Sequence, residues 1–174
     1  MKKYKLLLLL IGTAVMIVVM AKTGATLKTP TTPKGILDLE FACNSTKTAT
    51  VLNAWAPNDT IDNISAAKNN TYYDFIFLFF YSPFLFFACK KIAAITNSKI
   101  GVPIATAALC AGILDIFENA GMLLTLSNHS SANIAMLTTT ISIIKWVLAI
   151  AAVIYLLAGL VQLIVQKKLH LLLA

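Results

Sequence analysis

The sequence predicts an all-α protein: a polytopic membrane four-helix bundle with short amphipathic helices in an outer loop. Hydrophobic residues make up 59% of the 174 residues and charged residues only 12%, which lies outside the usual composition of a soluble domain. Four apolar segments are long enough to cross a hydrocarbon core, which takes about 20 helical residues. Lysines flank these segments at the ends that the alternation of spans places on one side of the membrane. Residues 1–174 are therefore predicted to form a single membrane domain.

The first predicted span covers approximately residues 6–21 and follows the basic sequence MKKYK. This apolar run is long for the core of a secretory signal, which has about 7–15 residues, and short for a free-standing span of about 20. We expect the span to be retained. A cleaved signal peptide, which would leave three spans, stays open as the alternative.

Residues 22–71 form the predicted outer loop. Apolar spacing favours one short helix over residues 35–42, with the sequence GILDLEFA, and a second over residues 45–56 that Asn44 caps. A third turn is predicted through Ile61 and Ile64, with Asn58 or Asp59 as its cap.

The outer loop has too few large apolar groups to bury an independent core. We expect its helices to lie over the mouth of the bundle, with Trp55 at headgroup depth. A disordered loop rich in Asn, Thr and Lys is the alternative. The regular apolar spacing favours the helices.

The remaining spans are predicted at approximately residues 72–89, 101–126 and 134–165. Because lysines gather on the cytoplasmic side of membrane proteins, we expect a multi-pass protein of the cell membrane. Both termini and the connection between the second and third spans are then cytoplasmic. The lysines that favour this orientation are Lys2, Lys3, Lys5, Lys90, Lys91, Lys99, Lys167 and Lys168.

The third span contains the sequence GILDIFENAG, which places Asp115, Glu118 and Asn119 at membrane depth. At about 100° per residue these three share one helix face with small residues such as Gly112, and bulky side chains lie opposite. An ionisable group at that depth is costly unless it is paired or hydrated, so it indicates a functional site. We expect this face to point into the bundle.

Lys145 in the fourth span is the predicted partner of these acids. The connection before the fourth span is short, so the third and fourth spans form an antiparallel hairpin. Glu118 then lies about two turns and Lys145 about three turns below the outer boundary, a gap that the lysine stem can bridge. The second span adds Asp74 near the outer rim and Tyr81 below it, and the fourth span adds Ser142 on the face of Lys145.

Three carboxylates around one lysine leave the predicted site net negative when all are ionised. In a low dielectric this state requires a bound proton or a bound cation. We therefore predict an outward-facing intramembrane acidic pocket for a lipid-like or cationic amphiphilic small molecule, such as a protonated amine. The predicted ligand-binding residues are Asp74, Tyr81, Asp115, Glu118, Asn119, Ser142 and Lys145.

Two other functions stay open. A membrane enzyme of the isomerase type would move a proton with Glu118 or Asp115 as acid and base. A non-catalytic structural or interaction subunit would pack its Gly and Ala faces against partner helices, and the ion pair of Glu118 with Lys145 would then only fix the helix register. Expected partners are membrane lipids, a small hydrophobic or amine ligand and, left open, a second copy of the chain.

Composition also excludes several classes of function. All basic residues are lysines, so the bidentate contacts that arginine makes to phosphates and guanine are absent and nucleic-acid binding is not expected. Three scattered cysteines and two histidines provide no metal or redox spacing. We expect neither a metal site nor a cofactor.

Four features are distributed along the chain: GILDLEFA after the first span, Trp55 in the outer loop, Asp74 and Phe75 opening the second span, and GILDIFEN in the third. Together they resemble a group of small, uncharacterised bacterial four-helix integral membrane proteins. More loosely, the layout is similar to the EXPERA family, which includes the sigma-2 receptor and emopamil-binding protein. That similarity implies an intramembrane pocket for sterols or amphiphilic amines, with Asp38, Asp74 and Glu118 as the nearest counterparts by position.

Overall fold

The computed structural model describes residues 3–57, 62–167 and 171, and all secondary structure in this part of the chain is helical. The predicted all-α class is confirmed. Four helices are long and apolar enough to cross a membrane, namely α1, α4, α5 and α6. The elements in chain order are α1 (Lys3–Thr23), the 3-10 turn η1 (Ala25–Leu27), α2 (Ile36–Glu40), α3 (Ser45–Ala54), α4 (Asn63–Thr96), α5 (Gly101–Leu126) and α6 (Ala132–Val165).

Polar side chains cap the starts of α3 and α6. The Asn44 carbonyl oxygen accepts a hydrogen bond from the Lys47 backbone N–H at 2.9 Å, as the sequence predicted for this cap. The Ser131 hydroxyl accepts from the backbone N–H of Ile134 at the start of α6. Such caps satisfy N–H groups that have no partner inside the helix.

The helix bounds match the predicted spans for α5 and nearly so for α6, which begins at Ala132. In contrast, α4 extends well beyond residues 72–89 at both ends. The predicted separate turn before it is wrong, because Ile64 lies in the first turn of α4 and Asp62 caps that helix. The other predicted residues of that turn, Asn58, Asp59 and Ile61, lie outside the described residues.

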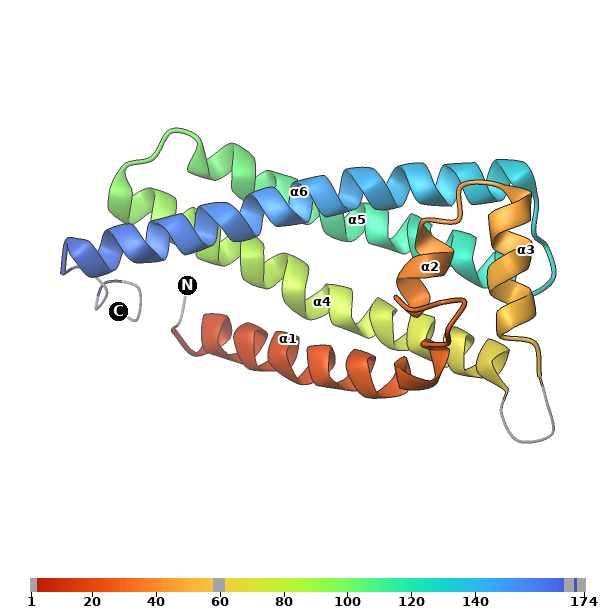
Figure 1. Ribbon diagram of the computed structural model, residues 1–174. Helices are drawn as coiled ribbons and strands as arrows, with labels where there is room; N and C mark the ends of the chain where they lie inside the picture. Colours follow the sequence, from red (N-terminus) through yellow and green to blue (C-terminus); the bar gives the residue numbers. More distant parts are fainter. Residues whose placement is uncertain (1–2, 58–61, 168–170, 172–174) are drawn as a thin grey trace.

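Helix α4 lies at the centre of the molecule and packs against α1, α5 and α6 (Figure 1). Helices α5 and α6 form an antiparallel pair, joined by a short connection near α3. Helix α1 lies against α4, on the side away from α5 in this view. The short helices α2 and α3 sit together at the end of the molecule where α5 and α6 are joined.

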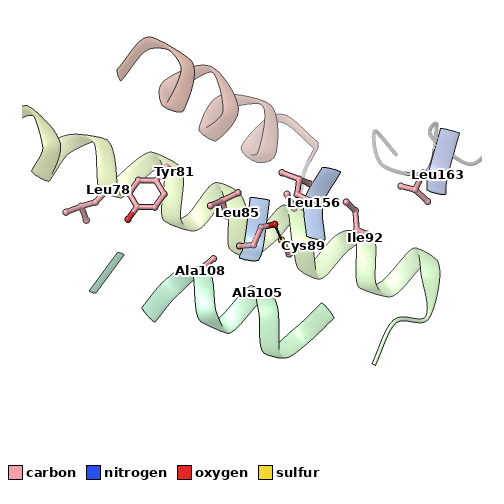
Figure 2. Packing of buried hydrophobic residues seen from close by; sticks show 11 residues of the cluster. Leu78, Tyr81, Leu85, Cys89, Ile92, Ala105, Ala108, Leu156 and Leu163 are labelled. Carbon is pink, nitrogen blue, oxygen red and sulfur yellow. Dashed lines mark hydrogen bonds between the residues drawn. The ribbon is translucent and has the colours of Figure 1, made fainter. Parts of the chain in front are cut away.

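Small residues let the three inner helices approach closely. Leu85, Cys89 and Ile92 of α4 face Ala105 and Ala108 of α5, with Leu156 of α6 beside them (Figure 2). The Cys89 thiol donates to the Ala152 carbonyl oxygen at 3.5 Å. A side chain at Gly159 would collide with Ile92, so the glycine permits this contact. Close van der Waals packing of this kind holds spanning helices together.

Residues 25–57, called here the outer segment after their predicted position, pack around Trp55 in a small apolar cluster that they share with α4 and α5. The indole is fully buried, and its Nε1–H group donates to the Leu27 carbonyl oxygen at 3.0 Å and to the Thr32 hydroxyl at 3.1 Å. Met122 and Leu126 of α5 complete the cluster. The loop packs on apolar side chains of α5, and this contact makes a buried site for an indole whose N–H group is satisfied. The position of Trp55 at headgroup depth stays a prediction.

Candidate functional site

Lys145 of α6 lies at the centre of a buried cluster of acids. Its Nζ atom is 2.7 Å from Glu118 Oε1 and 3.0 Å from Asp115 Oδ1. A third carboxylate, Glu40, places Oε2 at 3.9 Å. The ion pair of Lys145 with Glu118 that the sequence predicted is present, and it is one of three contacts rather than the only one.

The two acids of α5 are brought together by helix geometry. Asp115 and Glu118 are three residues apart and share one face, and their exposed fractions are 2% and 0%. One turn earlier, a side chain at Gly112 would collide with Ser82, so the glycine lets α4 and α5 approach at this level. The bulky side chains of Ile113 and Phe117 face outward, as the helical angles predicted.

Glu40 is the member of this cluster that was not predicted from the sequence. It ends α2, and its Oε2 atom accepts a hydrogen bond from Trp146 Nε1 at 3.1 Å. Its backbone carbonyl oxygen accepts from the Thr139 hydroxyl at 2.9 Å. One signal was present in the sequence: Glu40 follows Ile36 by four residues, so an acid lies on the apolar face of a short helix.

Asp74 and Tyr81 approach the cluster from α4. The Tyr81 hydroxyl donates to Asp115 Oδ2 at 2.7 Å, so both oxygens of Asp115 are bonded. Asp74 is buried, with an exposed fraction of 9%. The side-chain amide of Asn119 lies beside its carboxylate, and among the described residues no lysine forms an ion pair with it.

A cavity of about 560 Å³ adjoins this cluster. Its walls come from α1, α2, α4, α5 and α6, and most of the lining is apolar. The lining includes the polar residues Thr13, Glu40, Asn70, Thr71, Asp74, Tyr81, Asp115 and Lys145. Volumes of about 300–1,000 Å³ are typical of small-molecule sites.

Three of the predicted ligand-binding residues do not line the cavity. Glu118 is fully buried and accepts from Lys145 through Oε1, and its second oxygen is unbonded. Asn119 is likewise buried with neither polar atom of its side chain hydrogen-bonded. The Ser142 hydroxyl donates to the Thr138 carbonyl oxygen of its own helix. The other four, Asp74, Tyr81, Asp115 and Lys145, line the cavity.

The charges around the cavity do not balance. Asp74, Asp115, Glu118 and Glu40 face the single ammonium of Lys145, so full ionisation leaves three negative charges in excess. In a low dielectric, bound protons or a bound cation must offset them. Among the described residues, no group of three or more His, Cys, Asp or Glu side chains is arranged to hold a metal ion.

Taken together, the four apolar helices indicate a membrane protein, and the buried acids define it as one with a charged cavity between its spanning helices. No protein-family model matches this chain, and neither curated proteins nor solved structures yield a match.

Proposed function

We propose that this chain is a multi-pass protein of the cell membrane, a four-helix bundle with both termini in the cytoplasm. Its acidic intramembrane pocket binds a lipid-like or cationic amphiphilic small molecule, and α2 and α3 cover the bundle mouth on the outer side. Membership of the small bacterial four-helix group named above belongs to the same proposal.

The excess of carboxylates at one end of an apolar cavity is the observation that carries this function. A cluster that only fixed helix register would need one acid for each lysine. Here four acids surround one lysine, and three of them, Glu40, Asp74 and Asp115, line the cavity. An ammonium group would offset the surplus charge, and the apolar lining would receive a hydrocarbon chain.

Native mass spectrometry of the full-length protein in a mild detergent tests this function. Dodecylamine and dodecanol share one chain and differ in charge, so dodecylamine is expected to bind at least ten times more tightly, a difference of about 1.4 kcal/mol. Dodecanoate, with the opposite charge, is the matched control and should not bind. Equal binding of the amine and the alcohol, or binding of neither, would refute the proposal.

A membrane enzyme that transfers a proton is the second candidate. The favouring observation is the hydrogen bond from Tyr81 to Asp115 at the cavity wall, with Asp74 nearby, because a general acid and base must reach the reacting atoms. Glu118 does not line the cavity, so it would not reach them. Turnover of an added lipid that depends on pH and is lost in Asp115→Asn would favour this candidate over simple binding.

An interaction subunit is less well supported. The glycines at which an added side chain would collide, such as Gly101, Gly112 and Gly159, face neighbours within this chain. Their close contacts are therefore already used inside the molecule. Purification with a partner protein in fixed proportion would favour this role instead.

A further inference from the structure

We propose that the ligand is a single-chain amphiphile with a protonated amine, that it enters from the lipid between α1 and α6, and that Asp74 receives the amine. This inference rests on the proposed function and names its ligand, its route and its contact residue. The entrance, called here the lateral slot, is formed by Leu10, Thr13 and Ile17 of α1 and by Trp146, Ala149 and Val153 of α6.

The exposed rim of the cavity lies on spanning helices. Ile17 is 55% exposed and Val153 is 40% exposed, and both line the cavity. On the outer side the lining residue Glu40 is buried, and bonds to Thr139 and Trp146 hold α2 over that end. Because α1 and α6 are both long enough to span a membrane, a rim on these helices faces acyl chains rather than water.

Asp74 is the carboxylate of the cluster that is available to bind a ligand, because the other three are already bonded to side chains of the protein. Glu118 and Asp115 each bond to Lys145, and Asp115 also accepts from Tyr81. Glu40 accepts from Trp146. Asp74 alone among these four, within the described residues, forms no ion pair and has no bond to Lys145, Tyr81 or Trp146: only the neutral amide of Asn119 lies beside it, although it is 9% exposed and lines the cavity. A buried carboxylate that has only a neutral amide beside it is costly to ionise, and an ammonium group would offset its charge.

The length of the cavity suits one hydrocarbon chain. From Asp74 to Leu85, both lining residues of α4, the helix rises about 16 Å at 1.5 Å per residue. The same rise separates Lys145 from Leu156 on α6. This is about half of a hydrocarbon core 30 Å thick. The apolar residues below Asp74, including Phe84 and Leu85, would line a chain of that length.

Tryptophan fluorescence tests the route without relying on affinity. The chain has two tryptophans: Trp146 lines the slot, whereas Trp55 is fully buried in the outer segment. In vesicles of phosphatidylcholine with brominated acyl chains, we expect the lipid to quench Trp146 and dodecylamine to relieve that quenching by displacing lipid from the slot. Trp146→Phe should abolish the response.

An aqueous route predicts the reverse result. Acrylamide in water would then quench Trp146 more strongly than brominated lipid does, while dodecylamine still binds. That outcome would overturn lateral entry and leave the proposed function intact. Failure of dodecylamine to bind at all would refute both. Butylamine, which is soluble in water and lacks the chain, should not relieve the quenching; relief by butylamine would overturn the single-chain ligand.

Two pairs of variants test the contact and the slot. Asp74→Asn should weaken dodecylamine binding at least tenfold and Asp74→Glu should retain it, whereas Asp62→Asn, on the same helix outside the cavity, should leave it unchanged. Ala149→Phe should block the slot and remove the fluorescence response, whereas Ala120→Phe, exposed on α5, should not. Binding unchanged in a folded Asp74→Asn protein, verified by circular dichroism, would refute the assigned contact.

Discussion

Lys145 is the residue on which the buried charges depend. It contacts Glu118, Asp115 and Glu40, which come from two different helices. Removing one partner of a buried pair leaves an uncompensated charge, which is more damaging than the absence of the pair as a whole. The lysine therefore has a larger expected effect on stability than any one of its acids.

Lys145→Met is expected to lower the free energy of unfolding by about 3–5 kcal/mol, because Glu118 stays buried without its partner. Thermal unfolding in detergent, followed by circular dichroism, measures the loss. Lys99→Met, at an exposed position, is the matched control and should change little. Adding Glu118→Gln to Lys145→Met should restore part of the stability, since the unpaired charge is then gone. If the two substitutions changed the free energy of unfolding additively, the pairing of Lys145 with Glu118 would be contradicted.

The acids of α5 were predictable from the sequence, and Glu40 was not. Asp115 and Glu118 interrupt an apolar span, which is itself a signal. Glu40 lies in a polar loop and meets Trp146, which is 106 residues away in the chain. Contacts over such a separation depend on how the loop folds back onto the spanning helices. The spacing of apolar residues in the sequence does not predict that arrangement. The apolar neighbours Ile36 and Leu37 were the only local indication.

At the level of single elements, α4 shows why span length and helix length differ. Its first turns, from Asn63 to Thr71, are polar, so hydropathy places the span later. These turns continue the helix out of the apolar region and pack Ala67 into the cluster around Trp55. The Asn70 amide also bonds to Met20 and Thr23 of α1. Tertiary contacts extend the helix beyond what composition indicates.

The cap of α4 is expected to be sensitive to acid. Hydrogen bonds from the Ser65 hydroxyl, at 2.6 Å, and from its backbone N–H hold the pKa of Asp62 below its usual range. The ionised cap therefore stabilises α4 fully above the unfolded-state pKa, and this contribution is lost as the pH falls through the lower folded-state pKa.

Amide hydrogen exchange in the first turn of α4 measures this effect. The protection of Ser65 should decrease as the pH falls below about 4. Asp62→Asn keeps a capping side chain but cannot titrate, so its protection should not vary with pH in this range. The same acid response in both proteins would show that another group is responsible.

The outer segment is expected to depend on Trp55. Trp55→Ala leaves a cavity in its small core and should destabilise the segment by about 3–5 kcal/mol. Trypsin should then cleave faster at the exposed lysines Lys28, Lys34 and Lys47, while the spanning helices stay intact. Trp55→Phe keeps a ring and loses only the two bonds of Nε1, so its cleavage should increase less. Equal cleavage of the two variants would contradict a packing role.

For the molecule as a whole, orientation in the membrane follows from where the lysines lie. Figure 1 shows α1 beginning and α6 ending at the same end as the connection from α4 to α5. The helices α2 and α3 lie at the other end. If lysines mark the cytoplasmic side, the α2 and α3 end faces outward.

Thiol labelling tests this orientation. Cys43 is exposed in the outer segment, whereas Cys89 is buried and Cys110 is exposed along the spanning helix α5. A maleimide that does not cross membranes should label intact cells at Cys43. Cys43→Ser should abolish the signal. Labelling of Cys43 only after the membrane is permeabilised would place the outer segment in the cytoplasm.

The pairing of Lys145 with the acids of α5 has a consequence for biosynthesis. The ribosome completes Asp115 and Glu118 first, and their lysine follows 30 and 27 residues later. A newly made α5 alone would expose two carboxylates to lipid, which opposes its insertion. Helix α6 is strongly apolar and brings the neutralising charge. The last two helices are thus expected to leave the translocon as one hairpin, and a chain truncated before Lys145 should fail to insert α5.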